Sequence, residues 1–268
     1  MDEGYEIITV DAGNVDRLGF FCYMSKAKAP GYRQKRDWLM ARFAEGLRIE
    51  MLHETGGRTV GFIETIPGEY AWRAVNAAGY LVIHCLWVVG RGKGKGHGTR
   101  LLRTSLDEAR RQRLRGVAMV ASDGVWLAGK QLFLKNGFEQ VDVCACAGAA
   151  GASAKVVPAF RLLVHSFSET PNPVFPTDWA ARQASFGDGF TVIRTPQCPY
   201  IDDATADVLQ VAAERGIPAR AVELTSAQEA QSLSPSPYGT FGIVRDGRLF
   251  SYHYLCRKEL EKLLAECG

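Results

Sequence analysis

The chain has 268 residues, enough for one large domain or two modest ones, and a formal net charge of +3, too small for a general nucleic-acid binder. No apolar run approaches the ~18 residues that a membrane-spanning helix needs. The acidic start of the chain does not resemble a secretory signal, and the seven irregularly spaced cysteines favour a reducing compartment over a disulfide framework. We therefore expect a cytoplasmic protein without a membrane or nucleic-acid partner.

In chain order, the apolar periodicity of the first 168 residues predicts strands alternating with helices. The expected strands cover residues 6–10, 47–53, 59–66, 80–89, 117–122, 138–146 and 160–167. The expected helices cover residues 14–23, 34–45, 99–115 and 126–135, with a break at Pro30-Gly31 and a small-residue loop at 147–155. The segment 80–89 is apolar enough to be a central strand, so we expect an α/β (α+β) fold.

Prolines mark a boundary in the last third of the chain. Pro171, Pro173 and Pro176 fall within eight residues and oppose regular structure. We therefore expect a first domain over residues 1–168, a linker over 169–189 and a second domain over 190–268. In the second domain, strands are expected at 190–194, 219–224, 240–244 and 248–252, and helices at 199–215 and 257–266.

The most informative segment is residues 90–98, where glycine alternates with a basic residue or histidine: Gly-Arg-Gly-Lys-Gly-Lys-Gly-His-Gly. It joins the expected central strand to the helix expected at 99–115. A glycine-rich turn before a helix binds phosphate because consecutive backbone N–H groups point at the anion and the helix dipole favours its charge. The sequence therefore predicts a ligand that carries a pyrophosphate.

Other interpretations of this turn fit less well. A solvated loop or a basic patch for nucleic acid suits the composition, but no aromatic residues interleave with the basic ones. A dinucleotide-binding turn needs G-x-G-x-x-G near the chain start, whereas these glycines recur every second residue in mid-chain. A Walker A loop needs Gly-Lys-Ser/Thr, which the segment lacks.

The turn resembles the central motif of the GCN5-related N-acetyltransferase (GNAT) superfamily, [Arg/Gln]-x-x-Gly-x-[Gly/Ala] between a strand and a helix. Two registers fit, beginning at Arg91 or at Lys93, and the second leads directly into Thr99-Arg100-Leu101-Leu102. Residues 129–138 resemble the later family motif, Ala-x-x-x-Tyr-x-x-x-Gly-Phe. The resemblance covers residues 5–167 and implies the GNAT fold, a mixed, mostly antiparallel sheet with flanking helices.

The resemblance also implies acetyl-CoA as cofactor, coenzyme A as product and no metal. Pantetheine amides would pair with the backbone of Leu86, Trp87 and Val88. The pyrophosphate would lie on the N–H groups of Lys93, Gly94, Lys95, Gly96, His97, Gly98 and Thr99. Arg100 and Lys130 would reach phosphate or ribose, and Phe133 would lie beside the cofactor.

Two residues depart from the family pattern. Phe133 stands where a tyrosine often protonates the coenzyme A thiolate, and Trp126 stands where an asparagine is common. A thiolate of pKa ~8.5 is still a tolerable leaving group, and Tyr80 is a candidate replacement acid. Glu64 and His84 are candidate bases for the acceptor amine, although a solvated strand residue and a hydrogen-bonded sheet histidine are the simpler interpretations.

We expect the acceptor pocket near Tyr32, residues 67–79 and the helical residues 20–23. Its rim would be basic, through Lys26, Lys28, Arg33, Lys35 and Arg36. A basic rim favours a small-molecule amine that also bears an acidic group, although charges on solvated helices and loops are the simpler interpretation.

The second domain resembles a thioredoxin-like fold, and the whole chain resembles acetyltransferases with a YoaP-like C-terminal domain. Cys198-Pro199-Tyr200 precedes a helix, so the resemblance implies a stabilised thiolate at Cys198 and a cis-proline at Pro237. Ile201 replaces the second cysteine of Cys-x-x-Cys. A one-cysteine thiol site, a degenerate binding domain and a purely structural cysteine remain open.

Two functions follow from these observations. The first is an acetyl-CoA-dependent N-acetyltransferase in which an amine attacks the thioester directly. The alternative is a non-catalytic acyl-CoA-binding or thiol- or redox-responsive protein in which Cys198 is the working group. The pairs Cys144/Cys146 and His253/Cys256 each lack a second well-spaced pair, so we expect no metal site.

Overall fold

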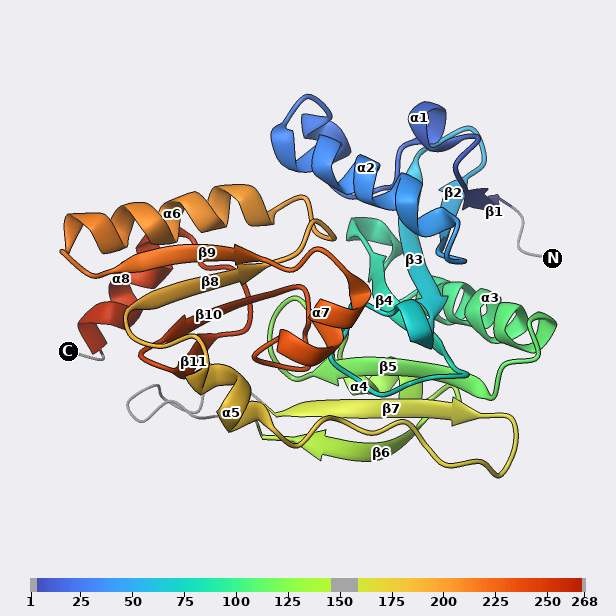
Figure 1. Cartoon of the computed structure of the whole chain (residues 1–268). Coiled ribbons are helices and arrows are strands. Elements are labelled where there is room, and N and C mark those ends of the chain that lie inside the picture. Colours follow the sequence, from blue (N-terminus) through green and yellow to red (C-terminus); the bar gives the residue numbers. More distant parts are fainter. Residues whose placement is uncertain (1–3, 146–158, 267–268) are drawn as a thin grey trace.

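The computed structural model describes residues 4–145 and 159–266, which form two sheets and their surrounding helices (Figure 1). The first sheet runs in the order β1-β2-β3-β4-β5-β7-β6. Its strands are β1 Tyr5–Val10, β2 Arg48–Glu54, β3 Thr59–Pro67, β4 Leu81–Val88, β5 Gly116–Ser122, β6 Glu139–Cys144 and β7 Phe160–Ser166. Among these strands, β4 and β5 pair in parallel and the other neighbours are antiparallel. The expected mixed, mostly antiparallel sheet with a central β4 is confirmed.

Helices cover both faces of this sheet, and three of them differ from expectation. They are α1 Val15–Leu18, α2 Pro30–Phe43, α3 His97–Arg111 and α4 Lys130–Leu134, with short 3-10 turns η1 Met24–Lys26, η2 Gly68–Tyr70 and η3 Gly90–Gly92. The helix expected over 14–23 ends at Leu18, since Gly19, Phe21 and Tyr23 have positive φ. Pro30 begins a helix instead of breaking one, because a first-turn proline loses no hydrogen bond. The helix expected from 126 begins at Lys130.

The strands β4 and β5 separate half-way along their length. Their pairing covers Leu81 to Ile83 against residues 117–119. On the other side of β4, the register with β3 shifts so that His84 is an extra, bulged residue. A bulge increases local twist and interrupts regular pairing. From His84 to Val88 the β5 side of β4 therefore faces an opening.

The second sheet has the order β11-β10-β8-β9. Its strands are β8 Phe190–Arg194, β9 Ala219–Glu223, β10 Phe241–Arg245 and β11 Arg248–Ser251, and its helices are α5 Trp179–Ala184, α6 Ile201–Glu214, α7 Ala227–Leu233 and α8 Arg257–Glu266. β8 and β9 are parallel and joined through α6, whereas β10 and β11 form an antiparallel hairpin. The four expected strands and the two expected helices are confirmed.

The sequence prediction missed α5 and α7. The α7 N-terminus has a readable signal, since Ser226 and Glu229 form an S-x-x-E pattern and the Ser226 hydroxyl accepts from the Glu229 N–H at 3.1 Å. Helix α5 falls inside the expected linker. Its Gln183 side chain bonds to the Pro235 carbonyl and to the Leu249 N–H, at 3.0 and 3.1 Å, so α5 packs with the second sheet. Below, residues 5–166 are called the first unit and residues 179–266 the second unit.

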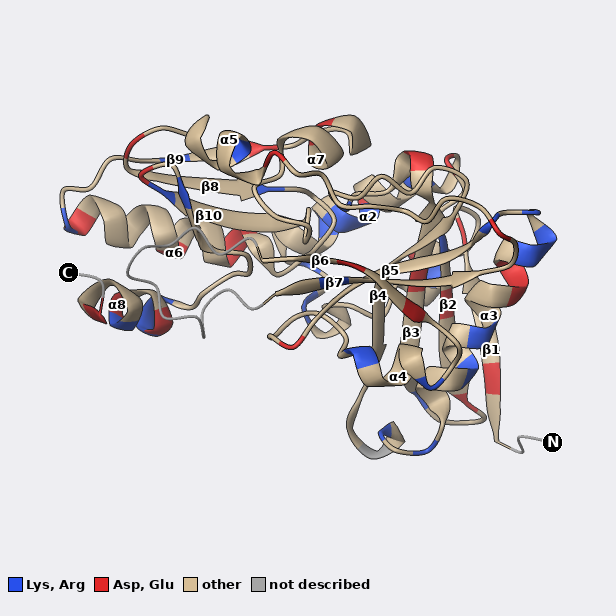
Figure 2. Ribbon diagram, turned by 90° about the horizontal axis from the view of Figure 1, so that it is seen from below, with Lys and Arg blue, Asp and Glu red and all other residues tan. Residues whose placement is uncertain are grey.

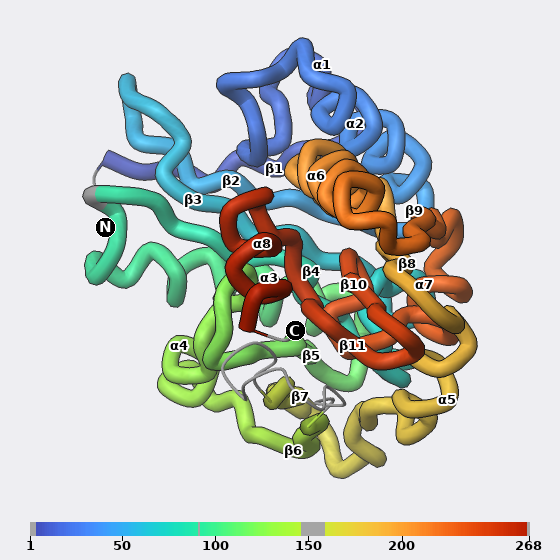
Figure 3. Tube along the Cα trace, turned by 90° about the vertical axis from the view of Figure 1, so that its left-hand side faces the viewer, coloured from blue at the N-terminus to red at the C-terminus, as the bar shows by residue number. Residues whose placement is uncertain are grey.

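The second unit lies against the first, with α6 beside α2 (Figure 1). Figure 3 views the molecule from the side on which the second unit lies, and there the second unit is in front of the middle of the first sheet. The contact is close: a Cβ added at Gly31 would lie 2.2 Å from the Pro199 carbonyl oxygen. Gln231 of α7 donates to the Ala71 carbonyl at 2.9 Å, and Arg194 donates to Gln34 at 2.7 Å.

One apolar core crosses this contact. It includes Trp72 and Val82 of the first unit together with Val192, Ile243 and Tyr252 of the second, all 1% exposed or less. A second apolar cluster lies between the other face of the first sheet and α3, and contains the fully buried Phe133. Shared burial of this kind makes the two units one cooperative body, because separating them would expose large apolar side chains to water.

Within the described residues, no helix is long and apolar enough to cross a membrane. Cys22, Cys85, Cys198 and Cys256 are free thiols. Cys144 is disulfide-bonded, which departs from the expectation for a chain whose cysteines indicated a reducing compartment. Cys146 and the expected loop at 147–155 lie outside the described residues.

Candidate active site

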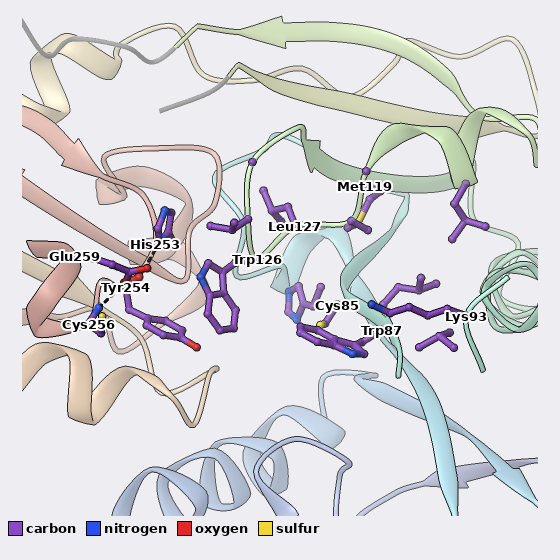
Figure 4. A pocket seen from close by; sticks show the side chains of 18 residues that line it. Cys85, Trp87, Lys93, Met119, Trp126, Leu127, His253, Tyr254, Cys256 and Glu259 are labelled. Carbon is purple, nitrogen blue, oxygen red and sulfur yellow. Dashed lines mark hydrogen bonds between the residues drawn. The ribbon is translucent and has the colours of Figure 1, made fainter. Parts of the chain in front are cut away.

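A cavity of about 880 Å³ opens where β4 and β5 separate. Its walls are the exposed half of β4, the loop that leads into α4, and the segment between β11 and α8 of the second unit. Figure 4 shows its length: Trp87 and Lys93 lie at one end, His253 and Glu259 at the other, and Trp126 between them. Most of the lining is apolar, as in typical small-molecule sites.

At the Lys93 end, the glycine-rich turn leads into α3. Gly94 and Gly96 have φ of +78° and +81°, a left-handed conformation that side chains oppose. A Cβ at either position would meet open space, so the turn is exposed. Gly96 is the N-cap of α3, and no described side chain caps this helix. The N–H groups of its first turn therefore point to solvent without an intrahelical partner.

The side chains around this turn are less exposed than the backbone. His97 is buried against the Tyr5 ring, and Arg100 donates to the Tyr5 carbonyl at 2.9 Å. Lys130 is half-buried at the start of α4. Phe133 packs edge-on against Phe138 in the core, and Leu132 of the same helix lines the cavity in its place. The backbone of this end therefore offers more to an anion than its side chains do.

Behind β4, Glu64 is the centre of a buried polar cluster. One carboxylate oxygen lies 2.6 Å from the Lys35 ammonium, and the other accepts from His84 and Gln197, both at 3.2 Å. Burial would raise the pKa of Glu64, but the Lys35 charge and the His84 hydrogen bond lower it to about 2. Glu64 is thus ionised at neutral pH, and three side chains, Lys35, His84 and Gln197, already bind its two oxygens.

The two ring nitrogens of His84 are both engaged. The Trp72 N–H donates to Nε2 at 2.9 Å, which makes Nε2 an acceptor and leaves the proton on Nδ1, facing Glu64. Burial, together with the Arg73 charge, lowers the pKa of His84 to about 4. The ring is neutral at pH 7, and its lone pair is not available to an acceptor amine.

Arg73 connects this cluster to the second unit. It is 3% exposed and donates to the His84 carbonyl of β4, to the Gln197 side chain at 2.9 Å and to the Thr240 hydroxyl. Gln197 follows β8 and Thr240 precedes β10. The guanidinium therefore fixes the bulged part of β4 to two loops of the second unit.

Other sequence-predicted residues lie elsewhere. Tyr80 is buried before β4, and its hydroxyl is 3.2 Å from the Thr170 hydroxyl, outside the cavity lining. Tyr32 stacks on Phe20, and Trp72 in the segment 67–79 is fully buried. The second unit covers the surface where the acceptor pocket was expected.

Two of the five residues of the expected basic rim, Lys35 and Arg36, are paired within the protein. Arg36 pairs with Asp16 and Asp37 at 2.8 and 2.9 Å. Lys35 is buried on Glu64, with its ammonium also 4.1 Å from the centre of the Trp38 ring. These cations hold the fold and do not form a positive surface for an acidic ligand.

Cys198 lies just before α6, as the sequence indicated, but without a stabilised thiolate. Burial raises its pKa, and this outweighs the hydrogen bond from the Tyr200 backbone. Burial and the charge of Glu64 also raise the pKa of the nearby Cys85 thiol, to about 12. None of the described peptide bonds is cis, so the cis-proline expected at Pro237 is also absent. These thiols are protonated at neutral pH.

The sequence analysis missed the far wall of the cavity. Trp126 has a φ of +69°, which is unusual for a bulky residue, and its ring centre lies 4.0 Å from that of Tyr254. Glu259 and His253 complete this wall. Only the family departure at Trp126 marked the region, because the second-unit residues reach the cavity through packing between units.

Comparison with known proteins agrees with this architecture. The model of the acetyltransferase (GNAT) family matches residues 16–138. A protein of Bacillus subtilis (strain 168), described as the uncharacterized N-acetyltransferase YoaP, is 30% identical over 262 residues, which is 96% of this chain and 97% of the relative. The chain belongs to the GNAT acetyltransferase family. It is therefore an acetyltransferase, and GNAT acetyltransferases use acetyl-CoA.

Solved GNAT structures are more distant. A putative acetyltransferase of Salmonella typhimurium, solved with acetyl-CoA, is 17% identical, covering 62% of this chain and 96% of its own, with a TM-score of 0.46. The ribosomal-protein-alanine N-acetyltransferase of Brucella melitensis is 17% identical, covering 60% of this chain and 99% of its own, with a TM-score of 0.45. Likenesses this distant do not indicate an acceptor.

Proposed function

We propose that this acetyltransferase transfers the acetyl group of acetyl-CoA to an amine inside the cavity between β4, α4 and the second unit. The main support is that one continuous cavity extends from the glycine-rich turn, past the opening beside β4, to the second unit. The name of the Bacillus subtilis relative supports an amine acceptor.

In this proposal, the pyrophosphate lies on the N–H groups from Gly94 to Thr99, where Gly94 and Gly96 allow close approach. The Lys93 N–H donates instead to the Gly90 carbonyl, at 3.2 Å. The backbone of Leu86, Trp87 and Val88 pairs with the pantetheine amides, since the β5 side of this part of β4 is unpaired. Lys93, at the cavity wall, supplies a positive charge. Arg100 and Lys130 remain secondary contacts.

The chemistry is acyl transfer by direct attack. The neutral amine attacks the thioester carbonyl near the bulge at His84, a C–N bond forms, and an oxyanion develops that an unpaired β4 N–H stabilises. The tetrahedral intermediate loses a proton from nitrogen to cavity water. The C–S bond then breaks, and coenzyme A leaves as a thiolate, for which a pKa of ~8.5 makes a separate acid unnecessary. A phenylalanine at position 133, which has no proton to donate to the thiolate, is compatible with this route.

We assign Glu64 and His84 a positioning role in this reaction. Their lone pairs are occupied by Lys35, Gln197 and the Trp72 N–H, so neither receives the amine proton. Together with Arg73 they hold the His84 peptide, at the point where β4 leaves β5. Tyr80 and Cys198 take no part in the transfer.

The β-α-β-α-β-β-α order of the second unit and its strand order β11-β10-β8-β9 support a thioredoxin-like fold as a proposal. We propose that it is a degenerate member that serves as a wall of the acceptor pocket. The division into a first domain at 1–168, a linker at 169–189 and a second domain at 190–268 stays a proposal. We modify it by moving α5 from the linker to the second domain, because α5 packs with the second sheet.

The test is release of free thiol from acetyl-CoA with a library of primary amines, together with calorimetry of acetyl-CoA binding. Amine-dependent thiol release with mass-spectrometric detection of an N-acetyl product is expected. Binding of acetyl-CoA without acetylation of any amine would overturn the proposal.

A further inference from the structure

The two ends of the cavity carry opposite charges. Lys93 lies at the end beside the glycine-rich turn, and Glu259 of α8 lies at the far end (Figure 4). A cation at the first end suits the phosphates of the cofactor. The carboxylate at the second end suits a ligand of the opposite charge.

The Glu259 carboxylate is not neutralised by its own helix. Acidic and basic residues alternate along α8 (Figure 2), and Arg257 pairs with Glu214 and with Glu261 at 2.9 Å. One Glu259 oxygen accepts from the Cys256 N–H at 2.9 Å. Over residues 4–145 and 159–266, Glu259 has no ion pair, so its charge is free to meet a ligand in the cavity.

Aromatic rings stand beside this carboxylate. The Trp126 and Tyr254 ring centres are 4.0 Å apart, and both rings line the cavity. Trp126 is 36% exposed, so much of its ring is open to a ligand. Aromatic faces attract cations through the ring quadrupole, with tryptophan the strongest.

The position of Trp126 is held from the second unit. The Tyr252 hydroxyl donates to the Val125 carbonyl at 2.7 Å, which fixes the residue next to Trp126. The left-handed backbone at Trp126 is strained for a bulky residue and persists only where its surroundings enforce it. Such strain concentrates in ligand sites, and here it directs an indole into the cavity.

Further acidic groups surround the same mouth. A smaller hollow of about 380 Å³ shares Tyr254 and Cys256 with the cavity and is also lined by Asp203 and Asp207. Lys26 is the cation on its wall, and Arg257 and Lys258 are the cations at the start of α8. Arg257 is already paired with Glu214 and Glu261, which leaves the two lysines beside three carboxylates, those of Asp203, Asp207 and Glu259. His253 faces the cavity with its Nδ1 2.7 Å from the Tyr254 carbonyl. Carboxylates therefore outnumber cations at this end.

We propose that the acceptor is a small diamine: one amine reacts beside β4, an apolar spacer runs along Trp126 and Leu127, and a second ammonium lies between Trp126, Tyr254 and Glu259. This substrate class rests on the proposed function. It departs from the acidic acceptor that the sequence suggested, because none of the five basic residues expected at the rim lines this cavity.

The experiment compares three amines of equal length: 1,6-diaminohexane, hexylamine and 6-aminohexanoate. With the full chain and saturating acetyl-CoA, kcat/KM is expected to be about tenfold higher for the diamine than for hexylamine, and lowest for the amino acid, consistent with an aromatic and carboxylate site. Glu259→Gln keeps an oxygen that can cap Cys256 and removes the charge. It should raise KM for the diamine about tenfold and change hexylamine kinetics less than twofold.

Charge reversal separates recognition from folding. Glu259→Lys should prefer 6-aminohexanoate over the diamine, a reversal that loss of structure would not produce. Glu266→Gln, on the same helix and outside the cavity lining, is the matched control and should behave as the parent. Equal use of diamine and hexylamine by the parent chain, or an equal effect of Glu259→Gln on both, would overturn the inference while amine acetylation stands. Absence of acetylation of every amine would overturn both.

Discussion

The two ends of the cavity differ in what lines them: backbone groups at one end and side chains at the other. The end at residues 93–99 consists mainly of backbone: two left-handed glycines, an uncapped helix start and an unpaired strand edge. The far end consists of side chains, Trp126 from the first unit and Tyr254 and Glu259 from the second. A backbone site depends on local sequence, whereas a side-chain site between units exists only once the units have docked. Changes to the chain should therefore affect the two ends separately.

The largest effect is expected where the units are joined. Arg73→Ala leaves the acceptors on His84, Gln197 and Thr240 without a donor, and we expect a loss of about 4 kcal/mol in the free energy of unfolding. Urea denaturation measures it. Lys262→Ala, which removes an ion pair with Glu266 that is exposed on both sides, is the comparison. A loss below about 1 kcal/mol for Arg73→Ala would mean that docking does not depend on this network.

Lowering the pH should reduce the stability of the contact between the two units, because His84 and Glu64 belong to the buried cluster that Arg73 connects to the second unit. The pKa of His84 falls from 6.5 to about 4 on folding and that of Glu64 from 4.5 to about 2, so the unfolded chain binds more protons. Stability contributed by His84 is lost as the pH falls from about 6.5 to 4, and that from Glu64 from about 4.5 to 2. For His84 the loss is about 3 kcal/mol.

The measurement is the free energy of unfolding of parent and His84→Gln between pH 7 and 4. The parent should lose stability through this window, and the variant should lose less because it lacks the titrating ring. Parallel curves would show that His84 does not titrate as its contacts imply.

The backbone end can be broken on its own. Gly96→Glu places a strained side chain and a negative charge against the pyrophosphate, and should weaken acetyl-CoA binding by about a hundredfold, or ~2.7 kcal/mol. Gly56→Glu is the matched control, since Gly56 also has a positive φ, +70°, and open space around it, but lies in the β2–β3 turn. Calorimetry that finds equal affinities for the two variants would place the cofactor elsewhere.

The smallest effect is expected at Cys198. Because burial raises the pKa of its thiol, Cys198→Ser should change acetyl-CoA affinity and kcat less than twofold. In the parent, iodoacetamide at pH 7 should modify the exposed Cys256 before Cys198, as peptide mapping can show. Fast modification of Cys198 would restore the thiol interpretation of the second unit.

The contrast between the two ends also explains how much the sequence could predict. Alternating patterns and the run of glycines specified the strands and the turn, since these depend on neighbours in the chain. The helix expected from residue 126 failed because tertiary contacts, including the bond from Tyr252 to Val125, hold Trp126 in a left-handed conformation. Tyr254 gave no signal because Trp126, whose ring it contacts, is more than a hundred residues away in the chain. Glu259 gave none because it lines the cavity only once the two units have packed together.

The late position of Gln197, Thr240 and Tyr252 in the chain has a consequence for synthesis. When residue 168 has left the ribosome, every strand that carries the glycine-rich turn has been made, yet Arg73 still lacks its partners and Trp126 is not yet held. Because the two units share one apolar core, the apolar surface of the first unit that they share stays exposed until the strands of the second unit have been made. The cooperative body, and with it the proposed acceptor end of the cavity, is therefore completed only once Tyr252 has been made.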